Sequence, residues 1–514
     1  MSERTLNNTI RFGMATVLIF APLAFGSVEF WSLTLVELLI LTLGALSLGW
    51  RLCSRMPEIE VPELEKKKTG KAGAISLAIL MGLFLAYTGL QMVPIPMSWL
   101  EKISPHVWQL QQFALGAPKI FTIFETEALA KESQQIVKAS APYAPITLNI
   151  HASAIEWFKT AVYVVFFWLI IAHFRRGRHF RQMARILIIL GAAMAILALL
   201  QRFGGADKIY WLRETAHKRF MGPFVNENHY AGYMEMTICL GLGYFLFRME
   251  QAAGSHRKKG WRHRLTSIKS PANGLILFAV VVMAVSVLFS LSRGGILTLI
   301  LSLLNIAYLV ALRQVVKKKR AAPAATQARN LLAPVLTACW LILLFAVWLG
   351  AEPVVEEMLT LRDVSRQIKL QVMRDTIGIV RDYPLVGTGM GTFPYVYPAY
   401  QSFSSDVLFT HTENDYLQLL SEGGVMGFAL MAGIIGWIGA VMMKGMLPRA
   451  SIANSRRPDN SPIILGCLAA LLSMLVHSFF DFNLHIPSNA LLFTAILAMG
   501  YGMSTLNVRE SHGR

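Results

Sequence analysis

The stretch HTENDYLQLLSEGGVMGFALMAGIIGWIGAVMM, residues 411–443, begins with charged and amide side chains and continues as an apolar run. A helix needs about 20 apolar residues to cross a bilayer, and the run from Val425 onward comes close to that length. At helical spacing, polar positions fall on one face: His411, Asn414 or Asp415, Gln418 and Glu422. The sequence therefore predicts a transmembrane helix with a polar stripe at the membrane surface.

The rest of the chain has the composition of a polytopic membrane protein. Of its 514 residues, 54% are hydrophobic and 15% charged, and the mean hydropathy is +0.49. These values exclude an ordinary soluble enzyme. The apolar runs predict an all-α fold with about twelve transmembrane helices, at residues 12–28, 31–50, 74–94, 154–174, 183–200, 230–247, 273–291, 295–312, 331–350, 425–443, 463–480 and 490–506.

Positive charge indicates how these helices are oriented. Alternate loops and the two termini hold 32 of the 48 Lys and Arg residues, and short cytoplasmic loops are enriched in these residues. Both termini are therefore expected in the cytoplasm, and the net charge of +18 is interpreted as a topology signal rather than as a sign of nucleic-acid binding. The loops at 96–151, 201–228, 292–294 and 351–410 are expected on the outer side, where nucleotide donors are absent.

The chain divides by composition into four expected regions. Residues 1–152 hold the first helices and the first outer loop, and 153–350 hold the central helices. Residues 351–424 form the large outer loop before the tenth helix, and 425–514 hold the last helices. The four cysteines show no CxxC spacing, so neither a disulfide framework nor a zinc site is indicated.

Arginines on the outer side are the first candidates for binding an anion. Arg293 lies in SLSRGG, residues 290–295, between two apolar runs. A guanidinium fork beside a helix N-terminus can bind a phosphate group, although a snorkelling arginine at a tight turn is the structural alternative. Arg219 lies in KRFMGPFVNENHYAGY, residues 218–233. In that segment Asn226 and Asn228 could simply cap the next helix.

A second group of cations lies in the large outer loop. Residues 361–380 place apolar side chains at helical spacing opposite Arg362, Arg366, Lys369 and Arg374. This pattern predicts a basic amphipathic helix on the outer surface. The next stretch, DYPLVGTGMGTF at 382–393, has no GK[ST], so a turn-rich loop is favoured over a nucleotide site.

His411 is the candidate general base, because an imidazole takes up a proton near neutral pH. Asp415 could orient it or share a metal ion with it. The chain has no DxD motif, so metal-dependent transfer is not supported, and Glu422 is expected to pair with a cation inside the bundle. The stretch HSFFDFNLHIPSN, 477–489, is interpreted as a structural hydrogen-bonding knot, with a second wall of the same site as the alternative.

Together these motifs resemble those of the O-antigen ligase and polymerase superfamily. The resemblance rests on R-x-x-G-x-F-x-N-x-N from Arg219, S-R-G-G at 292–295, P-L-x-G-x-G-x-G-x-F from Pro384, and H-T-x-N-x-Y-L-x-x-x-x-E-x-G from His411. It implies a GT-C-like fold, a polyprenyl-diphosphate-linked glycan donor, and neither a nucleotide sugar nor a required metal or cofactor. It also implies that Arg293 and Arg219 bind the donor diphosphate and that His411 acts in transfer.

We therefore expect en bloc glycan transfer from an undecaprenyl-diphosphate carrier to an acceptor hydroxyl at the periplasmic face of the bacterial inner membrane. His411 and Arg293 are the expected catalytic residues, and Arg219, Arg366, Asn414 and Asp415 the expected substrate-binding ones. The acceptor would be lipid A core, a growing glycan or a protein. A polymerase of the same superfamily and a lipid-linked glycan transporter or flippase are the two alternatives.

Overall fold

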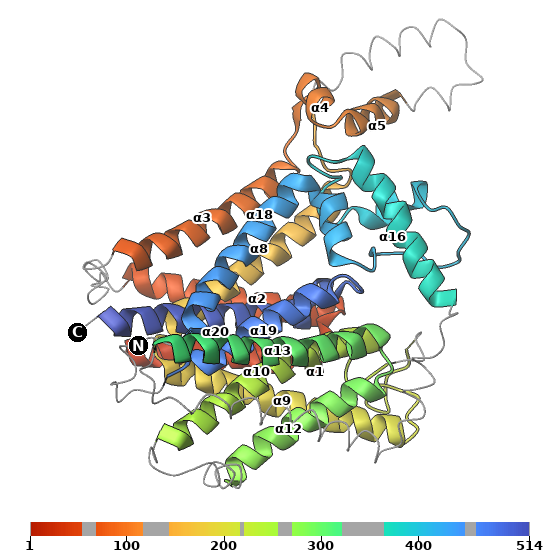
Figure 1. Cartoon of the computed structure of the whole chain (residues 1–514). Helices are drawn as coiled ribbons and strands as arrows, with labels where there is room; N and C mark the ends of the chain where they lie inside the picture. The colour runs from red at the N-terminus through yellow and green to blue at the C-terminus, as the bar shows by residue number, and fades with distance from the viewer. Residues whose placement is uncertain are drawn as a thin grey trace, which may run out of the picture. The chain divides into compact units, whose positions relative to one another are not determined.

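A computed structural model describes residues 2–53, 68–116, 143–215, 220–254, 270–320, 364–447 and 459–512 (Figure 1). Apart from one short antiparallel pair, β1 (Ile95–Pro96) with β2 (Tyr143–Ala144), the named elements of these residues are helical. The longer helices are α1 (Glu3–Leu23), α2 (Phe30–Cys53), α3 (Lys68–Leu90), α8 (Ile150–His173), α9 (Gly177–Phe203), α10 (Glu227–Gly254), α12 (Pro271–Phe289), α13 (Arg293–Arg320), α16 (Val364–Asp382), α18 (Asp415–Met446), α19 (Ser461–His477) and α20 (Pro487–His512). The shorter ones include α4 (Met97–Ile103), α5 (Pro105–Gly116), α17 (Phe393–Val396), η4 (Tyr397–Ala399) and η6 (Asn483–His485). The prediction of an all-α polytopic membrane protein is confirmed.

The predicted number of spans is only partly supported. In the described part of the chain, eight helices are long and apolar enough to cross a membrane: α2, α3, α8, α9, α12, α13, α18 and α20. Helices α1, α10 and α19 lie at three further predicted spans without being among these eight. The predicted span at 331–350 lies outside the described residues. The count of twelve and the GT-C-like arrangement therefore stay predictions.

The chain forms two compact units. The first, the bundle unit, consists of residues 1–75, 162–361 and 436–514, and the second, the loop unit, of residues 76–161 and 362–435. Arg293 belongs to the bundle unit, and His411 belongs to the loop unit.

Helices α10 and α19 form the centre of the bundle unit, where they lie side by side (Figure 1). Their backbones approach closely at two glycines, since a Cβ added at Gly243 would lie 2.6 Å from the Cα of Gly466. Small residues permit this kind of close helix packing in membranes. As a result, side chains further along the two helices, including Glu235 and His477, are brought into direct contact.

The loop unit has its own apolar core. Helix α16 contributes Val372 and Ile379, which are 0% and 1% exposed, and they pack with buried side chains from α4, α5 and the segment 383–397. The prediction that α16 is an amphipathic helix is confirmed, and its expected place on the outer surface stays a prediction. Part of its apolar surface packs into the core of the loop unit, whereas Leu370 and Ile377 are 45% and 41% exposed.

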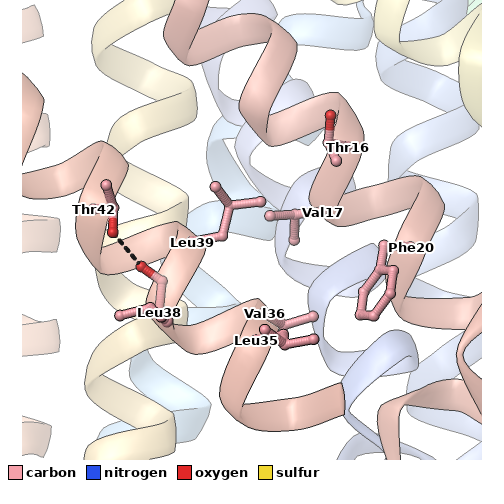
Figure 2. A pocket seen from close by; sticks show the side chains of 8 residues that line it. All are labelled: Thr16, Val17, Phe20, Leu35, Val36, Leu38, Leu39 and Thr42. Atoms are coloured by element: carbon pink, nitrogen blue, oxygen red, sulfur yellow. Dashed lines mark hydrogen bonds between the residues drawn. The ribbon is translucent and has the colours of Figure 1, made fainter. Parts of the chain in front are cut away.

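A cavity of about 360 Å³ lies in the bundle unit between α1 and α2 (Figure 2). Its two hydroxyl groups bond to their own helices, Thr16 to the carbonyl of Phe12 at 3.1 Å and Thr42 to that of Leu38 at 2.7 Å. The remaining lining is apolar: Val17, Phe20, Leu35, Val36, Leu38 and Leu39. The cavity contains none of the candidate site residues and lacks the polar groups that a glycan needs.

Candidate active site

Arg293 is the first residue of α13, directly after a tight connection from α12. Ser292 caps the helix: its Oγ accepts the backbone N–H of Gly295 at 3.0 Å and donates to Asn228 Oδ1 at 2.6 Å. A Cβ on Gly295 would lie 2.4 Å from the Cβ of Ala231, so the first turns of α10 and α13 are in contact. The expected cation at a helix N-terminus is therefore present, but the Gly295 amide is used by Ser292 rather than held open for an anion.

The start of α10 supports the capping interpretation for Asn226, whereas the side chain of Asn228 bonds to Ser292 instead. Asn226 Oδ1 accepts the backbone N–H of Asn228 at 2.8 Å, while Asn228 receives the hydroxyl of Ser292. Arg219 lies outside the described residues, so its role in diphosphate binding stays a prediction.

His411 lies in the loop that precedes α18, since this helix begins at Asp415. The prediction that His411 and Asn414 belong to a helical stripe is therefore wrong. The reason is Asn414, whose Oδ1 accepts the backbone N–H groups of Tyr416 and Leu417 at 2.9 and 3.0 Å. An asparagine in this position ends the extended chain and starts the helix.

Neighbouring contacts fix the His411 loop in place. The buried Thr412 donates its backbone N–H to Gln418 Oε1 at 2.9 Å and its hydroxyl to the carbonyl of Asn414 at 2.6 Å. Glu413, whose backbone has φ 58°, forms an ion pair with Lys369 of α16. His411 itself is half-buried, and its Nδ1 lies 2.9 Å from the hydroxyl oxygen of Thr410.

The other two predicted binding residues differ in how far the structure describes them. Asp415 is 9% exposed and occupies the first turn of α18, where a carboxylate is stabilised by the helix dipole. Arg366 belongs to the first turn of α16, and its side chain lies outside the described part of the chain. Substrate binding by both residues stays a prediction.

The glycine-rich loop at 382–393 is built around the side chain of Glu422. Its carboxylate accepts the backbone N–H of Gly391 at 2.9 Å and of Phe393 at 3.1 Å, and Gln418 Nε2 donates to it at 2.8 Å. The expected pairing of Glu422 with a cation is wrong, because these three donors hold its carboxylate. The predicted turn-rich loop is confirmed: its amides bind an internal carboxylate rather than a phosphate.

Close packing explains the glycines of this loop. Gly387 and Gly391 have φ +68° and +74°, a region that disfavours side chains, and a Cβ at Gly387 would lie 2.4 Å from the backbone carbonyl of Glu422. Gln91 bonds to the same segment, donating to the carbonyls of Val386 and Glu422 at 2.8 and 3.1 Å. The loop and the first half of α18 are therefore held together by hydrogen bonds and close backbone packing in the loop unit.

The stretch 477–489 joins a buried polar chain that sequence motifs reveal only in part. His477 Nδ1 lies 3.0 Å from Glu235 Oε2, and its Nε2 lies 4.0 Å from Asp481 Oδ2. Glu235 lies within the span predicted at 230–247, and no motif pointed to it. A single acid inside an apolar run was the available signal.

Two further questions about the site are whether it could hold a metal ion and whether Arg293 and His411 act on the same substrate. Among the described residues, no group of three or more His, Cys, Asp or Glu side chains could hold a metal ion. Arg293 and His411 each have a defined environment within their own unit. That they act on one substrate stays a prediction.

A search of curated proteins finds no match to this chain. A family model described as O-antigen ligase matches residues 278–432. The matched segment includes Arg293, Arg366, His411, Asn414 and Asp415, whereas the segments around Arg219 and His477 lie outside it. Residues 278–432 of this membrane protein therefore belong to the O-antigen ligase superfamily.

Proposed function

We propose that the protein transfers a glycan en bloc from an undecaprenyl-diphosphate carrier to an acceptor hydroxyl at the outer face of the bacterial inner membrane. The observation that carries this proposal is that the segment matching the O-antigen ligase family contains both a cation at a helix N-terminus, Arg293, and a histidine on a fixed loop, His411. Arg293 lies in a predicted outer loop and His411 directly follows another, and no nucleotide donor is available on that side.

The reaction forms one bond at the glycan's anomeric carbon and breaks another. The acceptor oxygen attacks C1, the bond from C1 to the diphosphate oxygen breaks, and the acceptor's proton passes to His411. Arg293 stabilises the negative charge that develops on the departing lipid diphosphate, which is the kind of fixed electrostatic contribution that dominates many such reactions. Arg219 and Arg366 are proposed to add positive charge, and Asp415 to orient the acceptor.

The contact between His411 and Thr410 is compatible with the tautomer that this mechanism needs. If the Nδ1–H group donates to Thr410 Oγ1 across the 2.9 Å contact, the basic lone pair lies on Nε2. A general base of this kind contributes typically about 10²–10⁴-fold to the rate. His411→Ala is therefore expected to lower transfer by roughly that factor.

The direct test uses liposomes that contain only this protein, a labelled undecaprenyl-diphosphate-linked glycan and a candidate acceptor lipid. Wild-type protein should form labelled acceptor without a nucleotide, and Arg293→Ala and His411→Ala should each abolish most of this product at unchanged protein level. Normal transfer by both variants would show that the mechanism is wrong. Lys444→Ala, in the last turn of α18, serves as a matched charge-removal control.

Ligase and polymerase differ only in the acceptor, so product analysis distinguishes them. A ligase leaves carrier-bound polymer unattached when it is deleted, whereas a polymerase leaves single units and no polymer. Lipid A core or a protein hydroxyl is the ligase acceptor, and a growing carrier-linked glycan is the polymerase acceptor. The liposome assay with each acceptor in turn separates these outcomes.

One observation favours the transporter alternative. Glu235 is 0% exposed within α10, and ionisable residues inside spans are common in transporters. A transporter would move the labelled lipid between leaflets without joining it to an acceptor. Leaflet-specific quenching of a fluorescent donor lipid in the same liposomes measures this movement directly.

A further inference from the structure

Four titratable side chains form a buried chain in the bundle unit, with acids and imidazoles in alternation. Glu235 and His477 are 0% exposed, Asp481 is 1% exposed and His229 is 7% exposed. The contacts are 3.0 Å from Glu235 Oε2 to His477 Nδ1, 4.0 Å from His477 Nε2 to Asp481 Oδ2, and 3.7 Å from Asp481 Oδ1 to His229 Nε2. Each of the two inner groups therefore lies between two partners of the opposite kind.

One end of this chain lies beside Arg293. His229 follows Asn228, which accepts the hydroxyl of Ser292, the residue before Arg293. On the other side, a Cβ at Gly294 would lie 3.5 Å from the Cβ of Phe480, the residue before Asp481. The starts of α10 and α13 and the segment after α19 therefore meet at this end of the bundle.

The other end of the chain stops inside the bundle. Ser473 Oγ lies 3.4 Å from Glu235 Oε2, and Ser302 donates to Ser473 at 2.6 Å. In the described part of α13, the next charged group is Arg313, roughly 16 Å further along the helix axis, where it pairs with Glu250. The series of titratable side chains therefore ends inside the bundle and does not form a path across the membrane.

Charge in this position needs an explanation beyond stability. Apolar side chains of similar volume are often as stable as a buried ion pair or more so, and ionisable groups within a membrane are unfavourable. Among the described residues, no cluster of His, Cys, Asp and Glu has metal-binding geometry. An alternating series of carboxylates and imidazoles can instead hold and pass a proton, since imidazole titrates near neutral pH.

We propose that the chain of Glu235, His477, Asp481 and His229 is a proton-binding site that takes up a proton when a diphosphate binds beside Arg293. The proposal rests on the proposed function, in which the diphosphate of the lipid-linked donor binds there. The proton comes from the solvent, and no covalent bond changes. The proton is shared along the series between His229 and His477, and Asp481 and Glu235 stabilise its positive charge.

The coupling follows from electrostatics. The remaining titratable groups on the adjoining turns of α10, α13 and η6 are Glu227, Tyr230, Tyr233, Cys239, Arg293 and His485. Of these, Arg293 carries a permanent positive charge, which disfavours a second positive charge on His229. A bound diphosphate offsets that charge, so the protonated imidazole becomes more favourable. By linkage, diphosphate affinity must then rise as the pH falls.

The experiment measures protons and binding together. Undecaprenyl diphosphate is added to the purified full-length protein in detergent, in weakly buffered solution near pH 6.5 with a pH-indicator dye, and its dissociation constant is measured in parallel. Wild-type protein should take up about one proton for each diphosphate bound. Glu235→Gln and Asp481→Asn, which keep hydrogen-bonding groups but cannot titrate, should take up less than half as much.

Glu250→Gln is the matched control, because it makes the same substitution at the other end of the same helix. Its uptake should equal that of wild type. If Glu235→Gln and Asp481→Asn bind the diphosphate and take up as many protons as wild type, the chain is only structural and the proposal is overturned. A lower melting temperature of these variants with unchanged proton uptake would overturn it as well.

A further variant separates this proposal from the proposed function. If Arg293→Ala binds undecaprenyl diphosphate as tightly as wild type, the proposed diphosphate site is wrong, and the coupling fails with it. If Arg293→Ala loses binding while the wild type binds without proton uptake, the proposed function stands and only the proton site is rejected. The diphosphate's own change in protonation on binding is common to the variants that bind it and cancels when these are compared.

Discussion

The two units satisfy their buried polar groups in different ways. In the bundle unit, Glu235 and His477 bond to each other from adjacent helices. In the loop unit, Glu422 bonds mainly to the backbone N–H groups of Gly391 and Phe393. A helix satisfies its own backbone, so its polar side chains need side-chain partners, whereas an irregular loop has backbone groups that side chains must satisfy.

This contrast indicates which polar residues can be replaced together. A pair of side chains can be exchanged for two apolar ones, because both members of the pair are removed. A side chain that accepts hydrogen bonds from backbone N–H groups differs, because a substitution cannot remove those N–H groups. The pair of Glu235 and His477 is therefore dispensable for folding in principle, while Glu422 is not.

The largest effect is expected for Glu422→Ala. It leaves the buried N–H groups of Gly391 and Phe393 and the amide of Gln418 without their acceptor, and each such group costs about 1–3 kcal/mol. The melting temperature in detergent should fall steeply, and Glu422→Gln, which keeps one acceptor oxygen, should fall less. Equal stability of Glu422→Ala and wild type would contradict the assigned role.

The next largest effect tests the bundle unit. Glu235→Leu alone should lower the free energy of unfolding by about 3–5 kcal/mol, because it leaves His477 buried without this partner. Adding His477→Leu should recover much of that loss, since both polar groups are then removed. A double variant that is less stable than the sum of the single variants would show that the two units do not differ in this way.

A smaller effect is expected for Asn414→Ala. Loss of the side chain that caps α18 should reduce stability by about 1 kcal/mol. Asn414→Asp, which keeps an acceptor for the N–H groups of Tyr416 and Leu417, should stay close to wild type in thermal melting. If Asn414→Asp lowers glycan transfer while stability is unchanged, the residue also contributes to substrate binding.

The smallest effect is expected for Thr410→Val. It removes the hydroxyl partner of His411 Nδ1, and the loss of one neutral hydrogen bond of about 1 kcal/mol should lower transfer several-fold through the tautomer of the imidazole. Thr410→Ser should retain the wild-type rate. Transfer in liposomes measures both, and an unchanged rate for Thr410→Val would remove Thr410 from the mechanism.

Much of the helical architecture was predictable because hydrophobic length and periodicity are local properties. The expected spans in the described residues coincide with helices, and the turn-rich loop around Gly387 was anticipated. The start of α18 was placed incorrectly because helical spacing alone does not show that Asn414 serves as a cap. The burial of Val372 and Ile379 of α16 in the loop unit was not predictable for a similar reason: an apolar face does not reveal whether lipid or protein covers it.

Composition and hydropathy alone were enough to establish an all-α membrane protein, and the motifs already indicated the O-antigen ligase superfamily. Which polar groups meet became visible only in the folded chain. Glu422 and Gly391 are 31 residues apart in the chain, and Glu235 and His477 are 242 residues apart. Helix periodicity reports the environment of a face, but contacts between distant segments depend on how the backbones pack, as at Gly243 and Gly466.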